Sequence, residues 1–457
     1  MVRRGSSWFV VARRQEIFIM SKNPMSASLS MLNRFSGSPL VHRLGLYKPA
    51  QAVARTAVRG GFKAGIAVAR QFKAVQKLVR PERFQQTTRL SDLFDLNVSE
   101  EQQLIRDMAQ RFAREIVRPA AIKADEMCSA PEGFDAQLAE LGLGQFAVPE
   151  TLGGAATEAS VVTGVLVAED LAYGDLGLAL AALAPIGVAN ALVRWGSADQ
   201  QAKYLPAFAE ASPPKASIAI AEPRPLFDPN ELRTRATIDG DGFLLKGEKS
   251  LVPLAESCDF LLVAASLVGK GPRIFIVPRD TAGMTIMADP ALGARAASLG
   301  RVVFDDVRLP SQAILGEGID VCDFGELLDL SRIALCALSV GTAQAILDYT
   351  ITYCNDRKAF GEPISNRQAV AFMIANIGIE VESMRLLTWR AAARAQVGLP
   401  FHREAYLARV LCAEKGMEVG TNGVQLLGGH GYIKDHPVER WYRDLMAVSV
   451  MEGGLLL

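Results

Sequence analysis

The chain has 457 residues, of which 50% are hydrophobic and 21% are charged, so it is globular and too long for one ordinary core. Its formal net charge is zero, but residues 1–90 hold 17 Lys and Arg against two acids, Glu16 and Glu82, so a basic arm precedes an acidic body. The six cysteines form no CxxC pair, and the four histidines have no metal-ligand spacing. This pattern excludes a disulfide framework and a zinc site, and no metal is expected.

The basic arm, residues 1–90, is predicted to be an amphipathic or disordered extension. Within it, residues 50–80 place apolar side chains near helical spacing with Lys and Arg between them, which suits peripheral contact with an anionic membrane surface. A mobile or partner-docked arm is an equally good interpretation, and nucleic acid is disfavoured as a partner. Residues 1–20 also resemble a transit peptide. We therefore expect a cytoplasmic protein, with membrane association as an option and a mitochondrial location as the alternative.

Residues 91–214 are predicted to form an N-terminal α-helical domain. Ser99 and a glutamine three residues later have the spacing of a capping box at a helix start, and Pro119 is expected to break the helix that follows. Residues 176–193 carry no charge, which reaches the lower length limit for a membrane span. Because this segment contains Pro185 and two glycines, we expect a pair of buried core helices there, with a membrane span as the alternative.

The period changes to short alternating or apolar runs in residues 215–318, which predicts a middle antiparallel β-domain with a hairpin turn at DGDG, residues 239–242. Residues 319–457 return to the helical period and are predicted to form a C-terminal four-helix bundle. Its long segments are expected near 323–355, 366–398, 401–427 and 436–452. Helices, strands and helices in separate blocks indicate an α+β, mainly α fold, because βαβ alternation is missing.

Three C-terminal segments carry the chemistry. They are YCNDRKAFGEPISNRQ (353–368), QLLGGHGYIKDHPVERWYRD (425–444) and MEGG (451–454). Together they resemble the acyl-CoA dehydrogenase family, whose signature is Q-x-x-G-G-x-G, an aromatic or aliphatic residue, and then D, R and D. The positions that fill this signature are Gln425, Gly428, Gly429, Gly431, Tyr432, Asp435, Arg440 and Asp444. The resemblance covers roughly residues 91–457 and implies the same helical, β and helical domains.

The resemblance implies an FAD-dependent oxidoreductase that forms a homodimer or homotetramer and passes electrons to an electron-transferring flavoprotein. The positions that match contacts to the FAD pyrophosphate and adenosine are Arg357, Phe360 and Gln368. The positions that match contacts from a neighbouring subunit to the adenosine half are Gln425, Gly428 and Gly429. Such residues suit the task, because arginine offers a permanently charged fork for phosphate and glycine lets the backbone approach a ligand closely.

Glu452 matches the family's catalytic base, which removes the α-proton of an acyl-CoA thioester while hydride leaves the β-carbon for the flavin. Desolvation by the apolar Val450 and Met451 is expected to raise its pKa, as a base for a weak carbon acid requires. Gly453 is expected to let the turn approach the substrate. Arg332 is predicted to face the same pocket, with a surface charge as the alternative. Without the resemblance, Glu452 reads as a carboxylate at a frayed C-terminus.

Two stretches depart from the family pattern. AEPRPLFD stands where T-E-P-x-x-G-S-D is usual, so Ala221 lacks the hydroxyl expected beside the flavin and Phe227 replaces a serine that helps to hold acyl-CoA. Val252 and Pro253 lie where W-I-T is usual, and proline has neither a side-chain donor nor a backbone N–H. Losing two neutral hydrogen bonds, each worth about 0.5–1.5 kcal/mol, is expected to weaken FAD binding without abolishing it.

The reaction indicated is the dehydrogenation of an acyl-CoA to its trans-2-enoyl-CoA, with Glu452 as the base. Ser331 lies where some family members carry their base and cannot supply one, which favours Glu452. The alternative is a family member that binds flavin or acyl-CoA as a scaffold without dehydrogenation, and the two altered stretches favour it. Leucines 455–457 are predicted to pack the tail against the bundle and so to hold the base in place.

Overall fold

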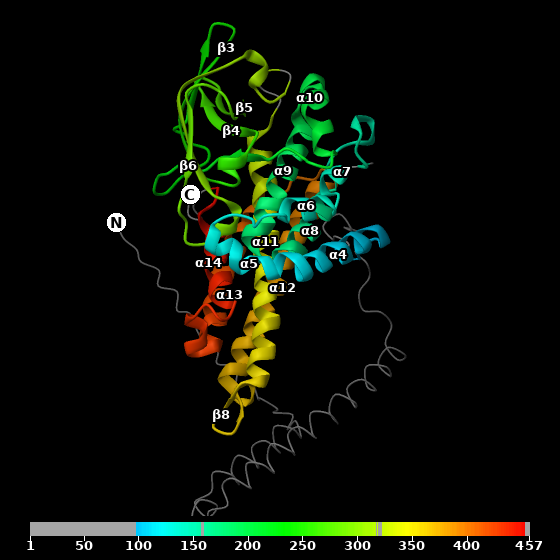
Figure 1. Cartoon of the computed structure of the whole chain (residues 1–457), viewed down its shortest axis with the longest axis vertical. Coiled ribbons are helices and arrows are strands. Elements are labelled where there is room, and N and C mark those ends of the chain that lie inside the picture. The colour runs from blue at the N-terminus through cyan, green and yellow to red at the C-terminus, as the bar shows by residue number, and fades with distance from the viewer. Residues whose placement is uncertain (1–96, 157–159, 317, 319–321, 453–457) are drawn as a thin grey trace, which may run out of the picture. The chain divides into compact units, whose positions relative to one another are not determined.

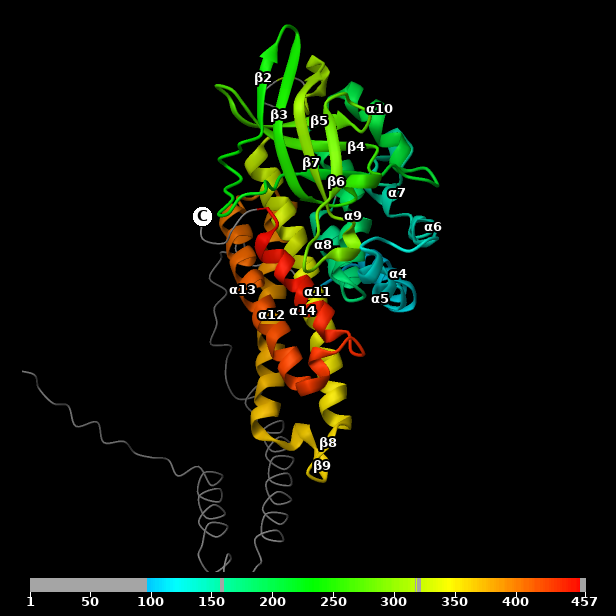
Figure 2. The same ribbon diagram turned by 60° about the vertical axis from the view of Figure 1, so that its left-hand side comes forward.

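The structure is a computed structural model of the chain, and it describes residues 97–156, 160–316, 318 and 322–452. The predictions for the basic arm, for Gly453 and for leucines 455–457 therefore lie outside the described residues. Residues 91–457 form one compact unit. In this unit a β-sheet stands at one end of the long C-terminal helices, and the shorter N-terminal helices lie against both (Figures 1 and 2).

The N-terminal helical part begins at the predicted capping box, in which Ser99 and Gln102 each accept a hydrogen bond from the other's backbone N–H. The expected break at Pro119 is wrong, because a π-helical turn leads directly into the next helix and Pro119 lies in its first turn, where no N–H is needed. The elements are α4 Glu100–Phe112, the π-helical turn Ala113–Val117, α5 Arg118–Met127, α6 Phe134–Ala139, α7 Leu143–Ala147, α8 Val161–Ala172, α9 Leu176–Trp195 and α10 Ala198–Phe208.

The uncharged segment forms a single helix, α9, with Pro185 inside it, so the expected pair of helices is wrong. Among the described residues, α9 and α11, Phe324–Asp356, are long and apolar enough to cross a membrane. More than half of the most apolar stretch of each is buried inside the protein, at 56% and 67%. This burial favours their role as core helices.

The middle part folds as a seven-stranded sheet in the order β1-β4-β2-β3-β7-β6, with β5 paired to β4. The predicted hairpin joins β2 to β3, where Asp239 pairs with Gly242 across a two-residue turn. The sheet is mixed and not purely antiparallel, because β4 runs parallel to both β1 and β2. The strands are β1 Ala216–Ala219, β2 Arg235–Asp239, β3 Gly242–Val252, β4 Phe260–Leu267, β5 Gly271–Pro278, β6 Met284–Ala288 and β7 Gly300–Leu309.

The C-terminal part is the predicted four-helix bundle. Its elements are α11, then the β8–β9 hairpin with strands Lys358–Ala359 and Glu362–Pro363, then α12 Gln368–Gln396, α13 His402–Leu427 and α14 Val438–Val450. Each helix begins and ends within about two residues of the limits expected from the apolar period. The last helix, α14, packs on α11 and α13, which brings the end of the described chain back toward the sheet (Figure 2).

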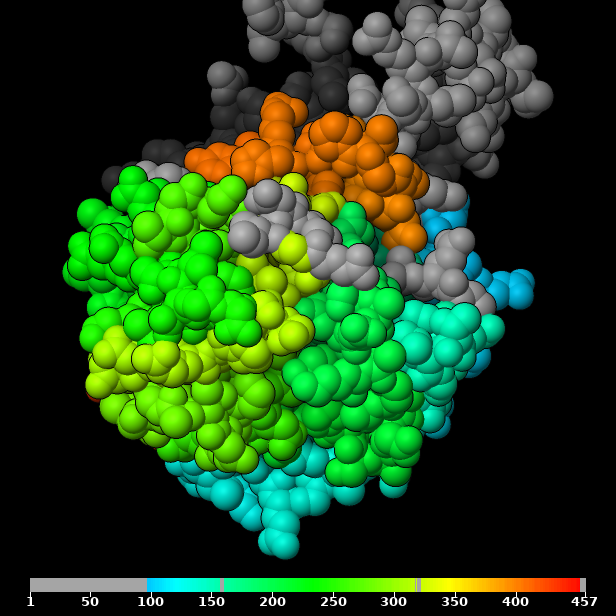
Figure 3. Space-filling view, turned by 90° about the horizontal axis from the view of Figure 1, so that it is seen from above, coloured from blue at the N-terminus to red at the C-terminus, as the bar shows by residue number. Residues whose placement is uncertain are grey.

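Shared cores join the three parts of this unit. One cluster of buried side chains contains Leu178 of α9, Leu299 beside β7 and Met451 after α14, so helices from both ends of the sequence meet the β-domain. Seen from the sheet end, the strands and the neighbouring helices form one continuous surface (Figure 3). All six cysteines are free, and all but Cys128 are buried.

Candidate active site

Glu452 lies where α14 ends and the backbone changes direction. Met451 leaves the helix with an extended conformation, and Glu452 then adopts a positive φ of 59°, which is rare for a residue with a Cβ. The Ser331 hydroxyl of α11 donates a hydrogen bond to Glu452 Oε1. The other oxygen, Oε2, is buried and has no hydrogen-bond partner among the described residues. The hydrogen bond from Ser331 thus fixes one carboxylate oxygen, and the other oxygen makes no hydrogen bond to the described residues.

Burial raises the pKa of Glu452 above its ordinary value, and three groups oppose this rise. They are the hydrogen bond from Ser331 and the positive charges of Arg409 and Arg332. The pKa of Glu452 is therefore shifted upward by burial, in the direction that the sequence predicted. The charge of Arg332 acts on the carboxylate, and its predicted place in the substrate pocket stays a prediction.

Arg332 is held by a neighbouring acid on its own helix. Its guanidinium lies 3.6 Å from Asp329, one turn away on α11, and Asp329 also lies 2.6 Å from the His402 ring at the start of α13. Burial raises the pKa of Asp329, and the nearby His402 and Arg332 oppose that rise. The α11 face beneath Glu452 therefore carries an ordered row of polar groups, although α11 is mostly apolar.

Four of the six residues predicted to contact the pyrophosphate and adenosine of FAD meet in one cleft. Arg357, Gln425, Gly428 and Gly429 line a cleft of about 360 Å³ together with Tyr353. Gly428 ends α13 with φ 59° and ψ −132°, a conformation that residues with a side chain avoid. A Cβ added at either glycine would meet no atom within 4 Å, so the backbone faces open space.

Phe360 and Gln368 lie near this cleft in the sequence but at exposed positions. Phe360, in the β8–β9 turn, is 95% exposed, and the Arg367 guanidinium stacks 5.0 Å from its ring centre. Gln368 begins α12 and is also exposed. Neither residue lines the cleft, so their predicted contact with FAD stays a prediction.

The two altered stretches of the middle domain lie side by side. The Ser250 N–H donates to the Ala221 carbonyl at 3.0 Å, and Lys249 Nζ lies 3.1 Å from Glu222. Ala221, Val252 and Pro253 are all buried. The structure thus brings these segments together, and their predicted contact with the flavin ring stays a prediction.

The Glu222–Lys249 pair is the best-buried ion pair of the β-domain, with side chains 3% and 0% exposed. Glu222 also accepts hydrogen bonds from the backbone N–H groups of Arg233 and Thr234, at 2.9 and 2.8 Å. Burial alone would raise the pKa of Glu222, but these partners bring it below its ordinary value. Burial lowers the pKa of Lys249 to about 8.

Phe227, predicted as a substrate contact, lies in the core. It is 6% exposed and belongs to the same apolar cluster as Ala221, Leu327 and Leu328, with the Arg224 guanidinium 5.3 Å from its ring centre. It therefore packs the β-domain against the start of α11. Its contact with an acyl-CoA stays a prediction.

Two positions of the family signature have a structural role here. Arg440 is buried and pairs with Asp175, the N-cap of α9, at 3.1 Å. Asp444 Oδ1 accepts a hydrogen bond of 2.7 Å from the Ala294 N–H in the loop before β7. These contacts tie α14 to the N-terminal helices and to the β-domain, and so they position the turn that carries Glu452.

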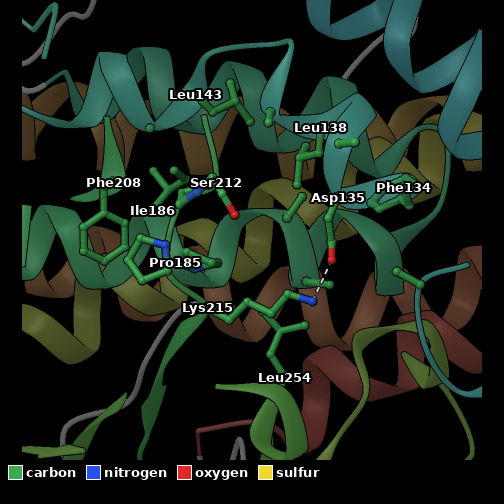
Figure 4. Close-up of a pocket in the computed structure, with 18 of the residues that line it drawn as sticks. Phe134, Asp135, Leu138, Leu143, Pro185, Ile186, Phe208, Ser212, Lys215 and Leu254 are labelled. Atoms are coloured by element: carbon green, nitrogen blue, oxygen red, sulfur yellow. Dashed lines mark ion pairs between the residues drawn. The ribbon is translucent and has the colours of Figure 1, made fainter. Parts of the chain in front are cut away.

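A larger cavity of about 860 Å³ lies between α6, α7, α9 and the segment before β1 (Figure 4). An ion pair of 2.6 Å between Lys215 and Asp135 crosses its lining. Ser331, Arg332 and Glu452 do not line it. This cavity is therefore separate from the residues around the predicted base.

Sequence reasoning missed Arg409 and the part played by Ser331. Arg409 is 4% exposed and lies on the buried face of α13, between Ala405 and Cys412. A charged residue among small apolar ones at helical spacing was the available signal. Ser331 was considered only for its inability to act as a base.

Comparisons with known proteins cover the same three parts of the chain. Models of acyl-CoA dehydrogenase domains match it in order: the N-terminal domain over residues 99–212, the middle domain over 217–307 and the C-terminal domain over 316–454. The short-chain specific mitochondrial acyl-CoA dehydrogenase of Bos taurus is 32% identical over 370 residues, which cover 78% of this chain and 88% of that protein.

Solved structures agree with the sequence relatives. Butyryl-CoA dehydrogenase from Megasphaera elsdenii superposes with a TM-score of 0.73 at 28% identity, covering 79% of this chain and 97% of that one. A chain in a structure described as the electron transferring flavoprotein of Acidaminococcus fermentans gives the same TM-score and identity and covers 79% and 96%. With three domain models in order and a relative above 30% identity, this chain belongs to the acyl-CoA dehydrogenase family of oxidoreductases.

Proposed function

We propose that the chain catalyses the FAD-dependent dehydrogenation of an acyl-CoA thioester to its trans-2-enoyl-CoA, with Glu452 as the base that removes the α-proton. The state of Glu452 carries this proposal. Ser331 holds one of its oxygens, the other is buried without a partner among the described residues, and burial raises its pKa. A base for a weak carbon acid needs both a fixed position and a raised pKa.

The side chains around Glu452 have different roles in the proposed proton transfer. Ser331 donates to Oε1 and so orients the carboxylate, which leaves Oε2 as the atom that takes the proton. The charges of Arg332 and Arg409 oppose the rise in pKa that burial causes. They favour the ionised form of the carboxylate, which is the form that accepts a proton.

The cleft at the end of α13, with a volume of about 360 Å³, suits the pyrophosphate and adenosine half of an FAD that is shared with a neighbouring subunit. Arg357 offers a fork for the pyrophosphate, and Gly428 and Gly429 present backbone to open space without Cβ atoms in the way. FAD bound there would supply the acceptor for the hydride that leaves the β-carbon. Ala221 and Pro253, which offer no side-chain donors, would leave the ring half of the cofactor to apolar and backbone contacts.

Exposed apolar side chains on α12 support a homo-oligomer. Phe372, Ile379 and Leu386 recur every seven residues on this helix and are 59%, 62% and 43% exposed. A stripe with this spacing forms a continuous face that a second copy would cover. When a second copy covers this face, the strongly exposed Phe360 would contact either that copy or FAD.

The electron acceptor and the compartment are proposed from the relatives. A structure described as an electron transferring flavoprotein contains a chain that resembles this one, which supports such a flavoprotein as the acceptor. The relatives include proteins named mitochondrial and proteins of bacteria, so they are consistent with both the cytoplasmic location and the mitochondrial alternative. Membrane contact through residues 50–80 stays a prediction, since that segment lies outside the described residues.

The test is anaerobic bleaching of the bound flavin by acyl-CoA. The panel runs from short to long and branched chains and begins with butyryl-CoA, because the relatives are named for short-chain substrates. Glu452→Gln should keep the flavin and lose the bleaching. Glu418→Gln, an exposed acid on α13, should bleach as the wild type does. Absence of bleaching with every acyl-CoA, or wild-type bleaching by Glu452→Gln, refutes the proposal.

A scaffold function is the second candidate. The burial of Ala221 and Pro253 in place of hydroxyl-bearing residues favours it, because the flavin ring would lose two polar contacts. Calorimetric binding of acyl-CoA by the flavin-loaded protein, with no bleaching at any chain length, would select the scaffold. Bleaching that depends on Glu452 would exclude it.

A further inference from the structure

Arg409 is a buried charge on the apolar face of α13. Its side chain is 4% exposed, and the buried residues around it on the helix are small, namely Ala405, Ala408, Cys412 and Ala413. Burying a guanidinium costs free energy unless its N–H groups find acceptors. The position of Arg409 therefore needs an explanation beyond packing.

The guanidinium of Arg409 reaches the turn that carries Glu452. Its Nη2 donates a hydrogen bond to the carbonyl of Met451, the residue that ends α14 and directly precedes Glu452. At this point the backbone passes from ψ 138° at Met451 to φ 59° at Glu452. A left-handed conformation at a residue other than glycine persists only where neighbours hold it. The Arg409 bond is one of the contacts that hold it.

We propose that Arg409 is the positioning residue for the base: it clamps the backbone before Glu452 and places a permanent positive charge beside the carboxylate. The proposal rests on the proposed role of Glu452 as the base. It gives α13 a part in proton transfer, in addition to the glycine cleft at its end. Arginine suits both tasks, because one arm of its planar fork bonds the carbonyl and because a guanidinium, although burial lowers the pKa of Arg409, is the side chain that keeps a positive charge best.

The groups that act on Glu452 come from two helices. From α11 these are the hydroxyl of Ser331, the guanidinium of Arg332 and the thiol of Cys336, and from α13 it is Arg409. The thiol stays neutral, because burial raises its pKa well above the ordinary value. Since Ser331, Arg332 and Arg409 all lower the pKa of Glu452, removing the Arg409 charge raises it further.

Two variants separate the charge of Arg409 from its geometry. Arg409→Gln keeps a hydrogen-bond donor but removes the charge, and Arg409→Lys keeps the charge but removes the fork. Arg385→Gln is the matched control, because Arg385 is a partly buried arginine of the same bundle that pairs with Glu169 at 2.7 Å, away from Glu452. The rate of flavin reduction by saturating acyl-CoA is measured anaerobically from pH 5 to 10, together with acyl-CoA affinity.

The expected results differ between the three variants. The acid limb of the rate profile moves to higher pH by about one unit in Arg409→Gln, the shift that an opposite charge at short range produces. In Arg409→Lys the acid limb of the rate profile stays at the wild-type pH, but the maximal rate falls. The acyl-CoA affinity stays unchanged in Arg409→Gln and in Arg409→Lys. Arg385→Gln lowers the thermal midpoint without moving the limb.

The outcomes also separate this inference from the proposed function. If Glu452→Gln reduces its flavin as the wild type does, the proposed function fails. If Glu452→Gln is inactive but the acid limb of Arg409→Gln coincides with that of the wild type, the inference about Arg409 fails alone. If Arg409→Gln does not fold, Arg409→Lys is the variant that tests the inference. A wild-type maximal rate in Arg409→Lys would refute the proposal that Arg409 clamps the backbone before Glu452.

Discussion

Replacing Lys249 by Met is expected to destabilise the β-domain by about 3 kcal/mol, at the lower end of the cost of breaking a buried ion pair. The lower end applies because Glu222 would still accept the two backbone hydrogen bonds from Arg233 and Thr234. The reverse change, Glu222→Gln, leaves Lys249 Nζ with the Ile220 carbonyl, 2.9 Å away, as its main acceptor.

A ceiling on the charge-related part of the Glu222→Gln cost follows from the proton on Lys249. The folded pKa of this lysine is about 8, so giving up its proton at pH 7 costs about 1 kcal/mol, at 1.36 kcal/mol for each pKa unit. The buried amine will release its proton before the penalty exceeds that value. The double variant has neither charge, so it should cost less than the sum of the two single changes.

The assay is guanidinium unfolding of the four members of this cycle, followed by far-UV circular dichroism at pH 7. Lys246→Met is the matched control on the same strand, because Lys246 is exposed and its pairs with Asp305 and Asp306 are worth little, so no change is expected. Additive single changes, or a cost below about 1 kcal/mol for both, would refute the reasoning.

The same pair predicts a pH dependence. The folded pKa of Glu222 lies below its ordinary value of 4.5, since its partners outweigh burial. A carboxylate with a lowered folded pKa binds fewer protons in the folded than in the unfolded state. Its contribution is therefore fully present above about pH 4.5 and is lost as the pH falls through the folded pKa.

Two glycine substitutions test other contacts. Gly293→Ala should lower the unfolding midpoint, because its Cβ would lie 1.9 Å from the Arg443 carbonyl of α14. Gly187→Ala is the control and should not lower the midpoint, because its Cβ would meet no atom within 4 Å. Equal midpoints for the two variants would count against the contact between Gly293 and Arg443. Gly428→Ala should weaken FAD binding about tenfold, since its Cβ would enter the open space of the cleft and the backbone conformation that shapes the cleft costs a residue with a side chain roughly 1–3 kcal/mol. Gly398→Ala, strained by a φ of 68° but outside the cleft, should leave FAD affinity unchanged in fluorescence titration, and a loss equal to that of Gly428→Ala would refute the assignment.

Local patterns were sufficient for most of the fold. The capping box at Ser99, the hairpin at residues 239–242 and the limits of the four bundle helices all depend on neighbours within a few residues, which periodicity and capping rules read directly. The parallel pairing of β4 with β1 and β2 could not be read in that way. Parallel and antiparallel strands share the same local pattern, and this pairing joins segments about 30 to 45 residues apart.

In the candidate site, too, local patterns could be predicted from the sequence and long-range contacts could not. The motif placed Glu452 and the glycine cleft, because those residues are contiguous in the sequence. Arg409 and Ser331 escaped notice because they act across 42 and 121 residues of chain, through contacts that exist only once the bundle has formed. Phe227 shows a contact that its motif does not reveal, since its side chain packs the domain interface, while its contact with acyl-CoA stays a prediction.

The two guanidinium groups beside Glu452 have a consequence for the course of the reaction. Before proton transfer, the carboxylate offsets part of their charge. If Glu452 is the base, its carboxylate becomes neutral on taking the proton and no longer offsets the charges of Arg332 and Arg409, so the protein side of the site would become more positive by one unit as negative charge develops on the substrate. The two arginines would then attract the charge that the departing α-proton leaves on the substrate.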